Sequence, residues 1–148
     1  MAWDRNDLIP QTEITEKVTQ RTVDFAKRFG AYLGKDDRRP STDRNGRNIE
    51  IKESKLTTSQ LRKFFGEVKR QQMSGYDETD FVLLKPKLAY AVGRAKDANA
   101  KINDFYFVIS KAIDNVSSEL HFKNFIKVFE AIVAYHKAAE ESKLNDNN

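Results

Sequence analysis

Residues 56–70 read LTTSQLRKFFGEVKR, and this stretch combines a helix start with a basic surface. Thr57 followed three residues later by Gln60 is the capping-box pattern that opens helices. Apolar side chains then recur at a spacing of three to four, which places them on one helical face. The stretch therefore predicts an amphipathic helix that begins near residue 58 and ends at Ser74 and Gly75, with its buried side formed by Leu61, Phe64, Phe65, Val68 and Gln72.

The same periodicity continues on both sides of this stretch and predicts further helices. One long helix is expected over residues 13–33, one from Ile102, and a last one from about Leu120 to His136. The acidic run at 77–80 predicts a short helical turn, because carboxylates favour a helix N-terminus. Pro86 is tolerated in a first turn, so another helix should start near residue 85 and run through LAYAVGRAKDANA. The small residues of that helix predict a close neighbouring helix.

We therefore predict an all-α fold, a compact bundle of about five to six helices forming a single helical domain over residues 1–148. The content of 39% hydrophobic residues, with ten Phe among them, is sufficient for a packed core. The best strand candidate, residues 48–52, is too short to build a sheet without partners. Residues 34–55 are accordingly expected to form an exposed basic loop, and residues 143–148 a polar tail.

The composition excludes several classes of protein. Without cysteine the chain has neither a disulfide framework nor a thiolate metal site. The N-terminus has no apolar run long enough for a signal peptide, and no stretch approaches the roughly 18 apolar residues of a membrane span. A soluble, cytoplasmic protein that does not contact the membrane is expected.

The net charge of +4 is unevenly distributed along the chain. Residues 57–76 carry four basic side chains against one acidic, whereas residues 102–148 carry five against seven. Positive charge is concentrated between residues 31 and 101. This distribution is compatible with RNA, with DNA or with an acidic protein surface as the partner.

Helical geometry places the cations of this region on exposed faces. In the helix from residue 58, the basic side chains fall between about 80° and 200° away from Leu61, outside the apolar sector. In the helix from Pro86, three basic residues are seven positions apart and would form one line, with about 10.5 Å between neighbours. Tyr90 lies beside that line. Such an array can contact phosphates and stack on a base, and its members are Arg62, Lys63, Lys69, Arg70, Lys87, Arg94 and Lys101.

A solvated charged face is the alternative interpretation of these cations. Against it, only Glu67 opposes four cations between residues 58 and 73, so ion pairs within that helix do not account for the charge. Nothing indicates an enzyme: His121 and His136 have no partner in sequence for metal or acid–base chemistry. No cofactor motif and no metal site are predicted. A metal-dependent nuclease using residues 77–80 is the least favoured alternative, since capping explains these carboxylates.

Three stretches carry a family resemblance: LTTSQLRKFFGEVKR at 56–70, LLKPKLAYAVGRAK at 83–96 and FKNFIKVFEAIVAYHK at 122–137. Together they resemble the small subunit of the type III-A CRISPR (Csm) RNA-guided interference complex, over the C-terminal two-thirds of the chain and in matching order. The loop at 34–55 contributes nothing to the resemblance.

The resemblance implies a non-catalytic helical subunit of an antiviral ribonucleoprotein. Its implied partners are guide RNA, target RNA, other Csm subunits and copies of itself arranged in a filament. The subunit would contact RNA phosphates while base pairing reads the sequence. By this resemblance the RNA-binding role extends to Arg62, Lys63, Arg70, Lys85, Lys87 and Arg94, and helix geometry adds Lys69 and Lys101. A helical scaffold whose basic face binds an acidic protein remains the alternative function.

Overall fold

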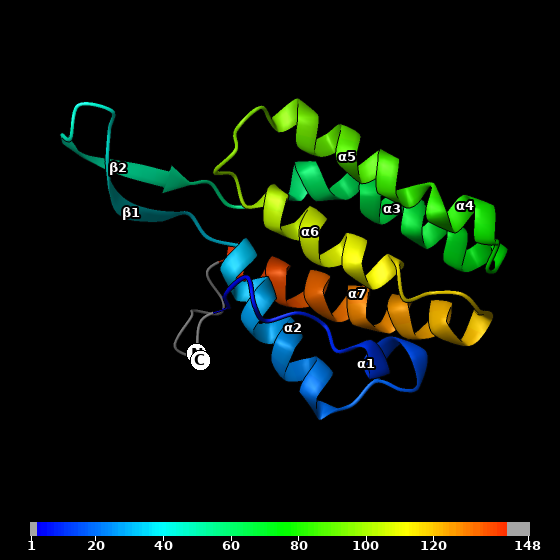
Figure 1. Ribbon diagram of the computed structural model, residues 1–148. Helices are drawn as coiled ribbons and strands as arrows, with labels where there is room; N and C mark the ends of the chain where they lie inside the picture. The colour runs from blue at the N-terminus through cyan, green and yellow to red at the C-terminus, as the bar shows by residue number, and fades with distance from the viewer. Residues whose placement is uncertain (1–2, 142–148) are drawn as a thin grey trace.

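The computed structural model describes residues 3–141, which form mostly helices and one small sheet (Figure 1). The polar tail predicted for residues 143–148 lies outside the described residues. Two of the helices are single turns of five residues. In chain order the elements are α1 (Gln11–Thr15), α2 (Gln20–Leu33), β1 (Asp37–Thr42), β2 (Asn48–Glu53), α3 (Thr58–Ser74), α4 (Glu78–Val82), α5 (Leu84–Ala95), α6 (Ile102–Ile113) and α7 (Glu119–Glu140).

The helix predicted over residues 13–33 is divided into α1 and α2, which corrects the sequence interpretation. The break is caused by capping: the Thr19 side chain accepts a hydrogen bond from the backbone of α2, and the Thr22 side chain accepts one from the Thr19 N–H. The buried Glu13 carboxylate accepts hydrogen bonds from both threonine hydroxyls and from Arg21. Burial alone would raise the pKa of Glu13, but these hydrogen bonds lower it on balance.

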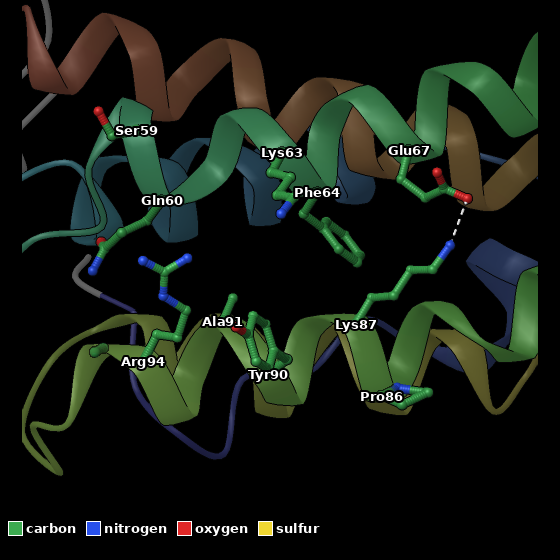
Figure 2. A pocket seen from close by; sticks show the side chains of 11 residues that line it. Ser59, Gln60, Lys63, Phe64, Glu67, Pro86, Lys87, Tyr90, Ala91 and Arg94 are labelled. Atoms are coloured by element: carbon green, nitrogen blue, oxygen red, sulfur yellow. Dashed lines mark hydrogen bonds and ion pairs between the residues drawn. The ribbon is translucent and has the colours of Figure 1, made fainter.

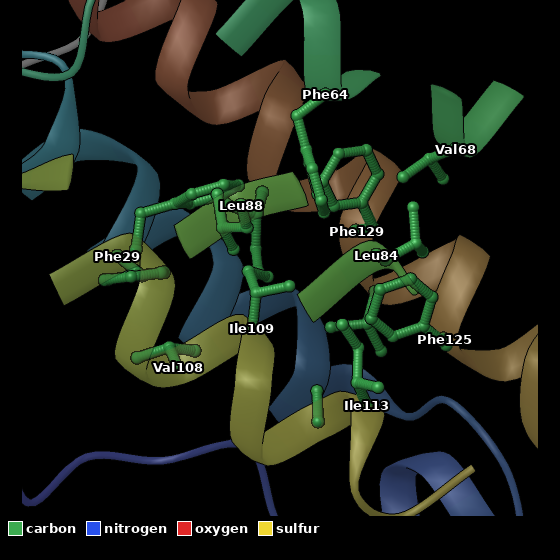
Figure 3. Close-up of a cluster of buried hydrophobic side chains, with 14 of the residues drawn as sticks. Phe29, Phe64, Val68, Leu84, Leu88, Val108, Ile109, Ile113, Phe125 and Phe129 are labelled. Atoms are coloured by element: carbon green, nitrogen blue, oxygen red, sulfur yellow. The ribbon is translucent and has the colours of Figure 1, made fainter. Parts of the chain in front are cut away.

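The core lies between α2, α3, α5, α6 and α7 and is rich in phenylalanine (Figure 3). Phe64 of α3 makes edge-on ring contacts with Phe105 of α6 and Phe129 of α7, with ring centroids 6.0 and 5.7 Å apart. Phe125 is stacked on Phe129 at 6.0 Å. Phe64, Phe125 and Phe129 are buried, and Phe65 is half-buried against the same cluster. The predicted placement of Phe64 and Phe65 on the buried side of α3 is therefore confirmed, whereas Gln72, predicted on the same side, is exposed.

The closest helix contact is between α2 and α7, and two glycines make it possible. A Cβ atom added at Gly30 would lie 2.6 Å from the Tyr135 Cβ, and one added at Gly34 would lie 2.7 Å from the Ala139 Cβ. The close packing expected along α5 is absent at Gly93, where a Cβ would meet nothing within 4 Å. Elsewhere along α5, Ala91 and Ala95 are packed against the core, and the helix contacts α3 and α6 as expected. The glycine contacts occur instead at the C-terminal end of α2, where Gly30 and the capping residue Gly34 face α7.

Residues 37–53 form an antiparallel hairpin in place of the predicted loop. The strand candidate at residues 48–52 lies in β2, and its partner β1 pairs with it from Asp37 opposite Glu53 to Thr42 opposite Asn48. The turn between them needs a positive φ, which Gly46 supplies at 75°. The all-α prediction holds for the bundle and is wrong here, because pairing with β1 gives the short β2 segment the partner that we did not expect.

Local sequence signals position α3, α4 and α5 as predicted. Thr57 and Gln60 form the capping box of α3, with both reciprocal hydrogen bonds present, and Gly75 follows its last residue. Asp77 caps α4 by accepting a hydrogen bond from the Asp80 N–H at 2.9 Å. Pro86 lies in the first turn of α5. The prediction that this helix continues to residue 100 is wrong, because α5 ends at Ala95 and Lys96 adopts the left-handed conformation with φ 52°.

Candidate nucleic-acid interface

A groove runs between α3 and α5 and has a volume of about 770 Å³ (Figure 2). Phe64, a core residue, lies at its base, and the small side chains of α5 leave the space above it unfilled. The groove is large enough for part of a nucleic-acid strand. Its lining consists of Ser59, Gln60, Lys63, Phe64, Glu67, Pro86, Lys87, Tyr90, Ala91, Arg94 and Ala95.

Two cations enter the groove from opposite walls. Figure 2 shows Lys63 of α3 and Arg94 of α5 pointing into the space between the helices. Both residues are exposed, and neither has a carboxylate partner within ion-pair distance among residues 3–141. Tyr90 is 66% exposed beside them, and the Arg94 guanidinium lies 6.0 Å from the centre of its ring. Cations combined with an exposed ring can contact phosphates and stack on a base.

Glu67 crosses the other end of the groove and neutralises two of the predicted cations. Its carboxylate lies 2.6 Å from the Arg70 guanidinium and 2.9 Å from the Lys87 ammonium, so the Lys87 pair joins α5 to α3. Hydrogen bonds from Arg70, then Lys87, lower the pKa of Glu67 to about 2. Glu67 therefore remains charged at neutral pH and holds both cations.

Carboxylates from other helices pair with two more of the predicted cations. Lys69 lies 2.7 Å from Glu130 of α7, and Lys85 lies 2.6 Å from Asp114, which follows α6. We expected ion pairs to leave the charge of α3 largely unmatched. That expectation was wrong for Lys69 and Arg70. Lys69 is matched by a carboxylate 61 positions away, which the sequence of α3 does not contain.

Contrary to the prediction, Lys101 does not lie on one exposed helix face with Lys87 and Arg94, and it is not part of the candidate site. Its side chain is fully buried, and its ammonium donates to the Asp37 carboxylate at 2.5 Å and to the Tyr32 carbonyl at 2.6 Å. The ammonium also lies 3.9 Å from the centre of the Tyr32 ring. Because α5 ends at Ala95, the helix that would have aligned Lys101 with Arg94 does not exist.

The candidate interface is therefore smaller than the sequence predicted. Among the eight predicted cations, Arg62, Lys63 and Arg94 are exposed and have no ion-pair partner within the described part of the chain. Ser59 and Gln60 line the same groove, but we interpreted Gln60 only as a cap. The helical spacing could have shown that Gln60 lies on the groove side of α3, because Gln60, Lys63 and Glu67 follow one another at intervals of three and four residues and so share one face.

The side chains considered for catalysis are engaged in structural contacts. The buried His136 ring donates from Nε2 to the Leu56 carbonyl at 2.6 Å, and the His121 Nδ1 accepts from the Ser117 N–H at 3.1 Å. No group of three or more His, Asp or Glu side chains within residues 3–141 is placed to hold a metal ion. Over the same residues, none of the helices has the length and apolar character needed to cross a membrane.

Comparison with protein families decides the relationship. The profile of the Csm2 Type III-A family matches residues 40–142, which is more than half of the chain. The chain belongs to the Csm2 type III-A family. It is thus a small subunit of the type III-A CRISPR complex, and the resemblance noted in the sequence is confirmed. No curated protein and no solved structure matches the chain.

The Csm2 match extends further than the resemblance did. It begins at residue 40, inside β1, and so includes most of the hairpin as well as α3 to α7. Both walls of the groove, α3 and α5, lie within the matched region. Most of the hairpin therefore belongs to the part of the chain that the family profile matches.

Proposed function

We propose that this Csm2 protein is a non-catalytic subunit that binds the RNA backbone without sequence specificity, through the groove between α3 and α5. Guide RNA and target RNA are its proposed ligands, and other Csm subunits and copies of itself are its proposed protein partners. The observation that carries the proposal is the pair of cations, Lys63 and Arg94, directed into one groove from two helices beside an exposed tyrosine.

The charge of the groove supports a phosphate ligand. Glu67 is the acidic residue of the lining, and its carboxylate is already paired with Arg70 and Lys87. Lys63 and Arg94 are consequently available to an external anion. An arginine can hold a phosphate with two parallel hydrogen bonds, and such contacts are the same for every base sequence.

Exposed apolar side chains support protein partners at another part of the molecule. Met73 is 89% exposed at the end of α3, Val82 is 51% exposed at the end of α4, and Leu83 is 45% exposed just before α5. Exposed apolar side chains of this size can be covered by a protein partner. Assembly with other subunits therefore uses a different surface from the groove in this proposal.

Binding of labelled single-stranded RNA at several salt concentrations tests the groove. Three phosphate contacts, one each for Arg62, Lys63 and Arg94, predict a slope of log K against log[salt] near −2, at about −0.7 per contact. The double variant Lys63→Ala, Arg94→Ala should bind more weakly and reduce the slope by about 1.4. Because several copies in a complex add avidity, the isolated chain is best measured first at low salt.

A matched control removes the same charge from outside the groove. Lys123→Ala, Lys127→Ala lies on α7, where both residues are exposed and neither lines the groove. Equal losses in the two double variants would mean that only net charge matters and would contradict the groove. RNA incubated with the protein and Mg²⁺ should stay intact. Cleavage that is abolished by a chelator and by Asp77→Ala would refute the non-catalytic part of the proposal.

The scaffold function remains the competing proposal, because five of the eight predicted cations are paired with carboxylates of the protein itself. Purification of the complex after nuclease treatment separates the two proposals. Loss of the protein partners on removal of RNA supports RNA binding. Partners that remain in the wild type but are lost on reversing the charges of Lys87 and Arg94 support the scaffold.

A further inference from the structure

The β1–β2 hairpin stands out from the helical bundle as an arm. Figure 1 shows it projecting from the end of the bundle where α3 begins and α5 ends. Most of its residues are exposed, so burial against the core does not hold the strands. Six residues at about 3.3 Å each make the arm roughly 20 Å long. Its tip therefore lies well beyond the surface of the bundle.

Cations along the body of the arm are neutralised by neighbouring carboxylates. Arg38 lies 3.3 Å from Glu50, Arg39 lies 3.8 Å from Glu53, and Lys52 lies 3.7 Å from Asp36, all measured between side-chain nitrogen and oxygen. These pairs are exposed and contribute little to stability. Their consequence here is electrostatic, because they leave the body of the arm with little attraction for an external anion.

The tip of the arm differs from its body. Arg44 and Arg47 are exposed in the turn, and neither has an ion-pair partner among residues 3–141. The nearest acidic residue in sequence, Asp43, is used by the backbone: its carboxylate accepts hydrogen bonds from the Asn45 N–H at 2.8 Å and the Arg47 N–H at 2.9 Å. The turn is thereby shaped by Asp43, while both guanidinium groups remain available.

The base of the arm is fixed to the bundle. The buried Lys101 ammonium holds Asp37 at the start of β1, and the Lys101 N–H donates to the Ser54 carbonyl just after β2, at 2.9 Å. Leu56 donates from its N–H to the Leu33 carbonyl at 2.8 Å, which joins the end of the arm to the end of α2. Both strands are thus attached at the base, and the arm has a defined direction.

We propose that this hairpin is a second RNA-binding element, in which Arg44 and Arg47 contact backbone phosphates beyond the end of the groove. The inference rests on the proposed function, since the RNA must lie along the α3–α5 groove for its strand to continue to the arm. Arg94 lies near the C-terminal end of α5, and the arm projects from that same end of the bundle (Figure 1). A strand leaving the groove past Arg94 would therefore meet the tip.

The chemistry of the tip favours a phosphate over an acidic protein. The turn residues between the strands are Asp43, Arg44, Asn45, Gly46 and Arg47, and none of them is apolar. Protein interfaces depend on buried aromatic or aliphatic anchors, which this turn lacks. Phosphate recognition needs only the planar, charged donors that arginine supplies.

The test compares two double variants of the full-length protein with equal loss of charge from the same arm. Arg44→Ala, Arg47→Ala removes the tip cations, and Arg38→Ala, Arg39→Ala removes two cations that are paired with carboxylates. Binding of labelled single-stranded RNA is measured from low to moderate salt. The two tip contacts added to the three at the groove predict a wild-type slope near −3.5, in place of the −2 that the groove contacts alone give. The tip variant should bind about tenfold more weakly near 0.15 M salt and return the slope to about −2, whereas the body variant should change both much less.

Each result separates the arm from the groove. Wild-type affinity in the tip variant, together with loss in Lys63→Ala, Arg94→Ala, would overturn the arm and leave the groove proposal intact. Loss in the tip variant with no loss in the groove variant would refute the groove and would also overturn the path past Arg94 by which we bring the strand to the tip. Equal losses in the tip and body variants would overturn the arm, because charge alone would explain them. Normal RNA affinity with failure to join other Csm subunits would also overturn it, in favour of a protein partner.

Discussion

Replacing Lys101 by Met should destabilise the protein, because it removes a buried cation that two elements need. The Lys101 ammonium donates to the carbonyl of Tyr32, which lies in the last turn of α2 and has no intrahelical partner there. It also pairs with Asp37 at 2.5 Å. No basic residue of α2 itself lies in its last turn, so Lys101 provides the positive charge that favours a helix C-terminus.

The magnitude follows from these two contacts. Met fills nearly the same space as the lysine stem, so the change leaves no large cavity and mainly deletes the charged donor. A hydrogen bond to a charged group contributes about 1.5–3 kcal/mol. Asp37 is 45% exposed and can be rehydrated, so its lost ion pair adds little. We expect a loss of about 2 kcal/mol and, for a domain of this size, a fall in Tm of about 4–8 °C.

Urea unfolding of the wild type, Lys101→Met and the control Lys127→Met measures this loss. Lys127 is exposed on α7 and has no ion pair within the described residues, so its substitution should change stability by less than about 0.5 kcal/mol. Hydrogen exchange should show faster exchange of the β1 and β2 amides in Lys101→Met. Stability equal to that of the wild type, or unchanged exchange in the hairpin, would refute the role of Lys101 at the base of the arm.

The structure also fixes the direction in which further substitutions change the stability of the protein. Gly30→Ala places a Cβ 2.6 Å from that of Tyr135 and should cost about 1–3 kcal/mol in urea unfolding, whereas Gly66→Ala, where a Cβ meets nothing within 4 Å, should stabilise α3 by up to about 1 kcal/mol. A Gly30→Ala variant as stable as the wild type would contradict the close contact of α2 with α7, and a destabilised Gly66→Ala variant would contradict the open space at α3. The pKa of Glu67 is lowered from 4.5 to about 2, so its contribution to stability is present above pH 4.5 and is lost as the pH falls toward 2. Glu67→Gln should remove this part of the acid sensitivity, and an unchanged pH profile between pH 2 and 6 would contradict it.

The helices could be predicted where a local signal sets their ends. Thr57 and Gln60 at the start of α3, Pro86 in the first turn of α5 and Ser118 before α7 act through their own backbone or nearest turn, so sequence spacing is sufficient to find them. The break after Thr15 was missed, because the apolar rhythm continues through it. There the hydrogen bonds of the buried Glu13 to the cap of α2 stabilise the interruption.

The candidate site could be predicted only in part, for reasons of distance along the chain. Lys63 and Arg94 were found because each lies on the exposed side of its own helix. Which cations are neutralised depends on residues from other elements, such as Glu130 beside Lys69, and helical spacing within one element does not reveal them. The misplacement of Lys101 has another cause, since extending α5 beyond Ala95 assumed a helix where the chain turns.

Gly34 belongs both to the tight contact of α2 with α7 and to the base of the hairpin. At this point the two helical backbones touch without intervening side chains, so the seam has no rotamers through which it could yield. A force applied to the far end of the hairpin would therefore be transmitted through Gly34 directly into this stiff pair of helices.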